Sequence, residues 1–124
     1  MSNGTERLHR KVEYGMLASF YAPLLTETQL TILRLYCCED LSYGEIAQQL
    51  NISRQGVSSS IFRSFDKLDQ LEKDFKLSER FFMLSKADTL LDTLKVDSES
   101  VTALQQVKDI ISTILNFEEG NNGV

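Results

Sequence analysis

The sequence predicts an all-α fold for this chain of 124 residues. Apolar residues recur at steps of three and four over long stretches, which is the spacing that gives a helix one apolar face. Pro23 is the only proline and glycine is scarce before the last few residues, so little interrupts these helices. The β-branched residues are scattered rather than alternating with polar ones, so no strand is expected.

Length and composition fit one domain or a domain plus an appendage, and the chain is expected in the cytoplasm. The chain is 42% hydrophobic and carries a formal net charge of -5, an acidity that argues against strong nonspecific binding to nucleic acid. No apolar run approaches the roughly 18 residues needed to cross a bilayer, and no signal peptide is recognisable, so membrane insertion is not expected. Cys37 and Cys38 are adjacent and cannot bridge each other. They fit a buried apolar pattern, although neighbouring thiols also sense oxidation or bind soft metals.

The first two predicted helices span residues 5–21 and 27–39. Pro23 ends the first helix soon after its last apolar position. Thr26 is expected to cap the second helix, and Gln29 completes a capping box three residues later. This second helix is apolar most of the way round, so we expect it at the centre of the domain.

Two further helices follow, joined by a turn of three residues. Ser42 and Glu45 form a second capping box that opens a short helix ending at about residue 50. Asn51 tolerates a left-handed backbone and is expected to end it. Ser53 then caps a helix of about six turns that begins at Arg54.

The remaining sequence predicts two amphipathic helices, over residues 78–94 and 98–117. They have three possible arrangements: folding back on the first helix, pairing as an antiparallel hairpin, or dimerising with a second chain. We therefore divide the chain into a helix-turn-helix domain with its N-terminal helix (1–77), a helical extension that packs on it or forms a dimer interface (78–117), and a disordered tail (118–124).

The short turn predicts a helix-turn-helix. That motif needs a small residue where the two helices cross, an apolar residue after the turn, and an apolar residue on the inner face of the second helix. Ala47, Ile52 and Val57 occupy these three positions in order. Asn51 stands where glycine is common and adopts the same left-handed conformation.

The second helix of the motif is predicted to face a polyanion. With Val57 turned inward, Gln55, Ser59 and Arg63 point outward, and no acidic residue occurs from 46 to 65. Arginine pairs with guanine edges and glutamine with adenine, while the start of the first helix suits phosphate contacts. The predicted DNA-contacting residues are Ser42, Tyr43, Ser53, Arg54, Gln55, Ser58, Ser59 and Arg63.

Three motifs carry a resemblance to known proteins. The segment 25–57 resembles the DNA-recognition domain at the C-terminus of bacterial sigma factors. Closer still is the similarity to the YlxM-like family of helix-turn-helix proteins, over roughly residues 8–85. Its motifs are "FYAPLLTETQ" (20–29), "LYCCEDLSYGEIA" (35–47) and "SRQGVSSSIFR" (53–63). The resemblance implies a sigma-factor-like, all-helical protein of the bacterial cytosol that regulates or assists the signal recognition particle pathway.

We expect no enzyme activity, cofactor or metal. His9 is the only histidine, and no phosphate-binding loop, metal-ligand spacing or nucleophile motif is present. The expected ligand is nucleic acid, DNA rather than RNA, bound by a homodimer whose two half-sites compensate for few cations. The alternative is a protein- or RNA-interaction module that assists the signal recognition particle without binding DNA.

Overall fold

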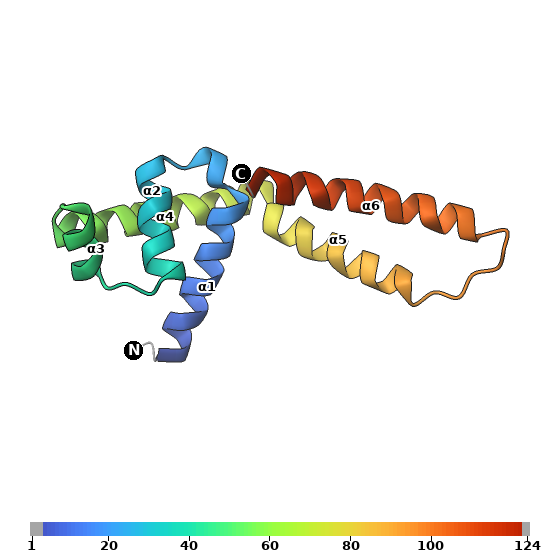
Figure 1. The fold of residues 1–124 in the computed structure, drawn as a ribbon, viewed down its shortest axis with the longest axis horizontal. Helices are drawn as coiled ribbons and strands as arrows, with labels where there is room; N and C mark the ends of the chain where they lie inside the picture. The colour runs from blue at the N-terminus through green and yellow to red at the C-terminus, as the bar shows by residue number, and fades with distance from the viewer. Residues whose placement is uncertain (1–3, 123–124) are drawn as a thin grey trace.

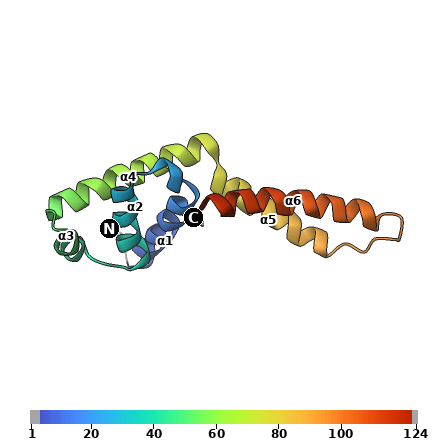
Figure 2. The ribbon, with the colours of Figure 1, turned by 45° about the horizontal axis from the view of Figure 1, so that its top comes forward.

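The computed structural model describes the backbone of residues 4–122 and the side chains of residues 10–117. Within that range every regular secondary-structure element is a helix and there is no strand, which confirms the all-α prediction. Four helices form a body, and the last two extend from it as a long arm (Figures 1 and 2). The helices are α1 (Gly4–Phe20), η1 (Ala22–Leu24), α2 (Glu27–Leu33), η2 (Arg34–Cys38), α3 (Tyr43–Leu50), α4 (Arg54–Phe75), α5 (Leu77–Asp92) and α6 (Val101–Asn122).

Both predicted capping boxes are formed. Thr26 Oγ1 accepts from the Gln29 N–H at 3.1 Å, and Gln29 Oε1 accepts in return from the Thr26 N–H at 2.9 Å. Ser42 and Glu45 exchange the same pair of bonds at the start of α3. Each box satisfies two N–H groups that a helix start leaves without a partner inside the helix. Local sequence therefore fixes where α2 and α3 begin.

Helix ends differ from the prediction in three places. The helix expected over 27–39 widens after Leu33 into the π-helical turn η2. Asp97 holds a turn by accepting from the Ser100 N–H at 2.8 Å, so α6 begins at Val101 rather than Ser98. At its other end α6 continues through Asn122, so residues 118–122 of the expected disordered tail are helical, while residues 123–124 lie outside the described range.

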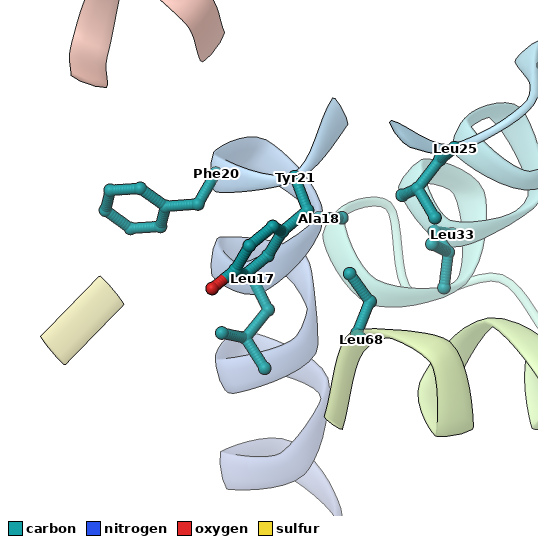
Figure 3. Close-up of a cluster of buried hydrophobic side chains, with 7 residues drawn as sticks. All are labelled: Leu17, Ala18, Phe20, Tyr21, Leu25, Leu33 and Leu68. Carbon is teal, nitrogen blue, oxygen red and sulfur yellow. The ribbon is translucent and has the colours of Figure 1, made fainter. Parts of the chain in front are cut away.

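The body has two apolar clusters, and α2 contributes to both. The first joins α1, α2 and α4 (Figure 3), and the second joins α2, η2, α3 and α4. Ile32 and Leu33 are each only 1% exposed, in accord with the prediction that this helix lies at the centre. The first cluster contains Leu17, Ala18, Phe20, Tyr21, Leu25, Leu33 and Leu68, and the second contains Ile32, Leu35, Ile46, Ala47, Val57 and Ile61.

Helix α1 packs on η2 where Gly15 meets Cys37. A Cβ atom added to Gly15 would lie only 3.3 Å from Cys37 Cβ, so the close approach of these two elements favours glycine. Burial raises the pKa of the Cys37 thiol to about 12. Cys38 is exposed, so the prediction of apolar packing holds for Cys37 and is wrong for Cys38.

An aromatic contact fastens α1 to α4. The rings of Tyr14 and Phe65 stack with centroids 3.8 Å apart and planes at 5°. The Tyr14 hydroxyl lies 2.9 Å from both carboxylate oxygens of Asp69, to which it donates. Burial and this carboxylate raise the pKa of Tyr14, so the hydroxyl remains a donor at neutral pH. The stack brings the middle of α1 beside the middle of α4.

The joint between the body and the arm depends on Glu72. Helix α4 ends at Phe75, and its C-cap residue Lys76, with a φ of 57°, turns the chain directly into α5. The Glu72 carboxylate accepts from the backbone N–H groups of Ser78 and Glu79, both at 3.1 Å. The Tyr21 hydroxyl donates to the same carboxylate at 2.7 Å. A side chain from the last turn of α4 therefore acts as the cap that the start of α5 lacks.

The arm is a hairpin of α5 and α6 that points away from α3. Lys108 and Asp92 form an ion pair between the two helices. The far end of α6 returns to the body, where the helix contacts α1 and η1 (Figure 1). Within residues 4–122, no helix combines the length and apolarity that crossing a bilayer requires.

Glu72→Ala should lower the free energy of unfolding by about 1–3 kcal/mol, because it leaves the start of α5 and the Tyr21 hydroxyl without an acceptor. Urea titration followed by circular dichroism measures this change. Glu79→Ala is the matched control, since the exposed Glu79 pairs with Lys76 at 3.8 Å and its loss should change stability by less than about 0.5 kcal/mol. Equal effects of the two substitutions would contradict the capping role of Glu72.

Candidate nucleic-acid interface

The candidate interface starts from the crossing of α3 and α4. Ala47 is 6% exposed and Val57 is completely buried, as the helix-turn-helix geometry requires. Asn51 has φ 56° and ψ 47°, and its N–H donates to the Ala47 carbonyl. Full burial of a valine is worth about 1.5–3 kcal/mol. The crossing is therefore stabilised by packing as well as by the turn.

One position of the motif differs from the prediction. Ile52 was expected to pack just after the turn, but 42% of its surface is exposed. Its N–H donates to the Ala47 carbonyl at 3.0 Å, so the backbone of Ile52 closes the turn although its side chain stays partly exposed. Ile52 instead lines a surface hollow with Thr31 and Leu50.

The outward face of α4 carries the polar groups predicted for it. Gln55 and Arg63 are exposed, while Ser58 and Ser59 are half-buried. The Gln55 side-chain amide lies 3.3 Å from Ser59 Oγ and donates to it, which orients the amide along the helix. Phe62 is 75% exposed. These five residues line one shallow hollow of about 350 Å³.

Arg54 does not share this hollow. Its guanidinium lies over Gly44, where an added Cβ would be 3.6 Å from Arg54 Nε and 3.8 Å from Cζ. The side chain thus reaches from the start of α4 to the first turn of α3. Tyr43, the residue before Gly44, is half-buried and packs on Tyr36 with ring centroids 5.3 Å apart.

The two N-cap serines are partly occupied by their own helices. Ser42 Oγ accepts from the Glu45 N–H, and the Ser42 N–H donates to the Glu45 carboxylate. Ser53 Oγ accepts from the Gly56 N–H at 2.9 Å. Each hydroxyl keeps its own hydrogen for donation to an anion. At Ser42, however, the backbone N–H is already used.

The start of α4 is the more open anion site. The backbone N–H groups of Arg54 and Gln55 have no acceptor among the described residues, because they belong to the first turn of the helix. The helix dipole adds partial positive charge there, and no carboxylate occupies that turn. At α3, by contrast, Glu45 places a negative charge in the first turn. Hydrogen bonds from the Ser42 backbone and side chain hold the pKa of this carboxyl below its ordinary value of 4.5.

Two cations near this surface were not predicted from the sequence. Arg10 and Lys11 of α1 line a cavity together with Tyr43 and Ser58. They precede α4 by more than forty residues, and the Tyr14–Phe65 stack brings them beside it. Such an approach has no signal in local spacing. Among the described side chains, no cluster of three or more His, Cys, Asp or Glu residues is placed to hold a metal ion.

Comparison with known proteins finds similarity to one family. A family model described as "UPF0122: Putative helix-turn-helix protein, YlxM / p13 like" matches residues 8–112. A UPF0122 protein of Acetivibrio thermocellus is 37% identical over 110 residues, covering 83% of this chain and 94% of that protein. A UPF0122 protein of Exiguobacterium is 37% identical over 111 residues, covering 90% and 98%. UPF0122 protein YofM of Lactococcus lactis is 34% identical over 95 residues, covering 76% and 86%. No solved structure matches the chain.

The matched range confirms the resemblance to the YlxM-like family and extends it. The three motifs place the similarity within roughly residues 8–85, whereas the family model continues to residue 112, well into α6. The arm is therefore part of what the family shares.

Glu45→Gln tests the cap of α3 through its pH dependence. The pKa of Glu45 is lower in the folded chain than in the unfolded one. The ionised carboxylate therefore stabilises the fold above the unfolded pKa, and this stabilisation is lost as the pH falls through the folded pKa. A glutamine keeps the cap, as Gln29 does in α2, without titrating. The melting temperature of the natural chain should therefore fall relative to that of the variant as the pH falls below about 4.5. A constant difference in melting temperature would contradict the assignment.

Proposed function

This chain belongs to the UPF0122 family of YlxM/p13-like helix-turn-helix proteins, and from that premise we propose that it is a non-enzymatic regulatory protein of the bacterial cytoplasm that binds duplex DNA. The observation that carries the proposal is the outward face of α4. It gathers an amide, two hydroxyls and a guanidinium in one hollow. No carboxylate interrupts the sequence from residue 46 to residue 65.

The geometry supports a division of roles between the two arginines. Arg63 and Gln55 face outward from the helix that enters the major groove in such motifs, so they are the groups to read base edges. Arg54 lies across the start of α3, where the first helix of the motif crosses the DNA backbone. We therefore assign Arg54 to a phosphate, together with the hydroxyls of Ser42 and Ser53.

The arm supports a homodimer. A two-helix hairpin has no interior of its own, and among the described arm residues only Ser78 and Ile111 are buried. Ten large apolar side chains of the arm are 37 to 67% exposed. Pairing two arms would cover much of this surface, and stable interfaces bury about 800 Å² per partner. The ten are Phe82, Met83, Leu90, Leu94, Val96, Val101, Val107, Ile110, Ile114 and Phe117.

A second copy is the partner that best fits the arm. The same patch can serve both chains about a two-fold axis. The arm points away from α3 and from the start of α4 (Figures 1 and 2). Pairing of two arms therefore leaves α4 of each chain, the proposed reading helix, free to meet DNA. Two copies of a weak half-site also compensate for an interface with few cations.

The second candidate function is a protein- or RNA-interaction module that assists the signal recognition particle without binding DNA. The acidity of residues 77–124, which hold eight acidic and four basic residues, favours a basic partner for the arm. Salt separates the two functions. Duplex binding that weakens steeply with added salt supports DNA binding, whereas salt-tolerant binding to a protein with no affinity for DNA supports the alternative.

Arg63→Ala should weaken binding to a duplex selected by this protein from a random-sequence pool by about tenfold, because a base contact is lost. Arg54→Ala should weaken binding to all duplexes alike and reduce the slope of log affinity against log salt by about 1. Fluorescence anisotropy measures both effects. Lys73→Ala, which changes an exposed cation in the last turn of the same helix, is the matched control and should bind as the natural chain does. Natural affinity in both arginine variants would refute the groove-reading role.

Ile110→Lys should convert the dimer to a monomer, because it places a charge within the exposed apolar surface of the arm. Sedimentation equilibrium gives the mass directly. Ser112→Lys introduces the same charge about 200° round α6 and should leave the dimer intact. A natural chain that is monomeric at high concentration would contradict the proposed dimer.

A further inference from the structure

The cavity that Arg10 and Lys11 line, called the aromatic hollow below, lies between α4, α1, η2 and α3. Its volume is about 220 Å³. Four aromatic rings line it, those of Tyr36, Tyr43, Phe62 and Phe65, and the cations Arg10 and Lys11 line it as well. Ser58 and Phe62 also line the outer hollow, so the two hollows share one wall.

The rings differ in how much of their surface is already covered. Tyr14 stacks on Phe65 at 3.8 Å and 5°, which uses one face of that ring. Lys11 Nζ lies 4.3 Å from the centroid of Tyr36, which also contacts Tyr43. Phe62 has no ring contact with the described residues and is 75% exposed. One large apolar face at the edge of the hollow is therefore available for stacking.

The two cations differ in how far their charge is already balanced within the protein. Lys11 Nζ pairs with Asp40 at 2.6 Å and its side chain is only 15% exposed, so its charge is largely balanced within the protein. Arg10 is exposed and forms no ion pair with the described side chains, although its guanidinium also interacts with the Tyr14 hydroxyl. An anion at the mouth of the hollow would thus meet the guanidinium of Arg10 and the hydroxyl of Ser58.

We propose that this aromatic hollow binds a single unpaired nucleotide, with the base inside against Phe62 and the phosphate outside at Arg10. The volume is below the roughly 300–1,000 Å³ of pockets for drug-sized ligands, so it suits one flat ring system rather than a whole nucleotide. Stacked aromatic rings beside a cation are the combination by which proteins hold unpaired bases.

This site goes beyond binding of a duplex. A base within a duplex is paired and stacked and cannot enter such a hollow unless it is extruded. The nucleotide therefore comes either from a single strand or from free nucleotide in solution, and both sources present the same base and phosphate.

The test titrates the full chain with three probes: a fluorescent single-stranded oligonucleotide, AMP followed by NMR, and a blunt duplex. Phe62→Ala should weaken binding of the single strand by about tenfold, because base stacking on an aromatic ring is lost. Arg10→Ala should also weaken it and lower the salt slope by about 0.7. Phe75→Ala removes a similarly exposed ring of α4 outside the hollow and should bind as the natural chain does. Circular dichroism verifies that all three variants remain folded.

The results distinguish a single strand from free nucleotide as the source of the bound base, and they distinguish this site from the proposed duplex interface. Loss of strand binding in Phe62→Ala with no AMP binding assigns the site to a strand, and parallel loss of AMP binding assigns it to a nucleotide from either source. No binding of strand or AMP by the natural chain, or undiminished binding by both Phe62→Ala and Arg10→Ala, overturns the proposal. Applied to the natural chain, the duplex probe reports on the proposed function alone, so either proposal can fail while the other stands.

Discussion

The close crossing of α3 and α4 is the constraint on which the rest of the surface depends. Ala47 is small enough for α4 to approach, and Val57 fills the contact without any exposure. With Val57 held inward, the 3.6-residue period of the helix leaves Gln55, Ser59 and Arg63 no position except the outer face. The left-handed backbone at Asn51 makes this approach possible within three residues, because it reverses the chain without a longer loop. The direction of the polar face therefore follows from an apolar contact.

Helix α4 joins this face to the arm. Its first turns carry the proposed interface, its middle stacks on α1 through Phe65, and its last turn caps α5 through Glu72. Because Tyr21 of the body donates to the same carboxylate, α5 leaves the body at a fixed joint rather than through a free linker. Burial and the bond to Glu72 raise the pKa of Tyr21 to about 12, so this donor is retained across the physiological range. In a dimer joined by its arms, this joint would set the spacing of the two reading helices.

Sequence patterns that span only a few residues predict most of the fold and part of the site. Capping boxes, the left-handed Asn51 and the apolar spacing predict where α2, α3 and α4 begin, since each depends on residues a few positions apart. The same patterns do not predict the π-turn at η2 or the exposed Ile52, which depend on how the whole body packs. They also miss Arg10 and Lys11, because these cations reach α4 through the long-range contact of Tyr14 with Phe65. Contacts between distant segments leave no periodic signal in one sequence.

We propose that a nucleic acid lies against the outer face of α4 and the start of α3. Mapping of backbone amide shifts by NMR during titration with duplex DNA tests this directly, because each residue reports its own surroundings. We expect the largest shifts at residues 42–44 and 53–63, with small shifts along the arm. Shifts confined to α5 and α6, or none at saturating duplex, would contradict it.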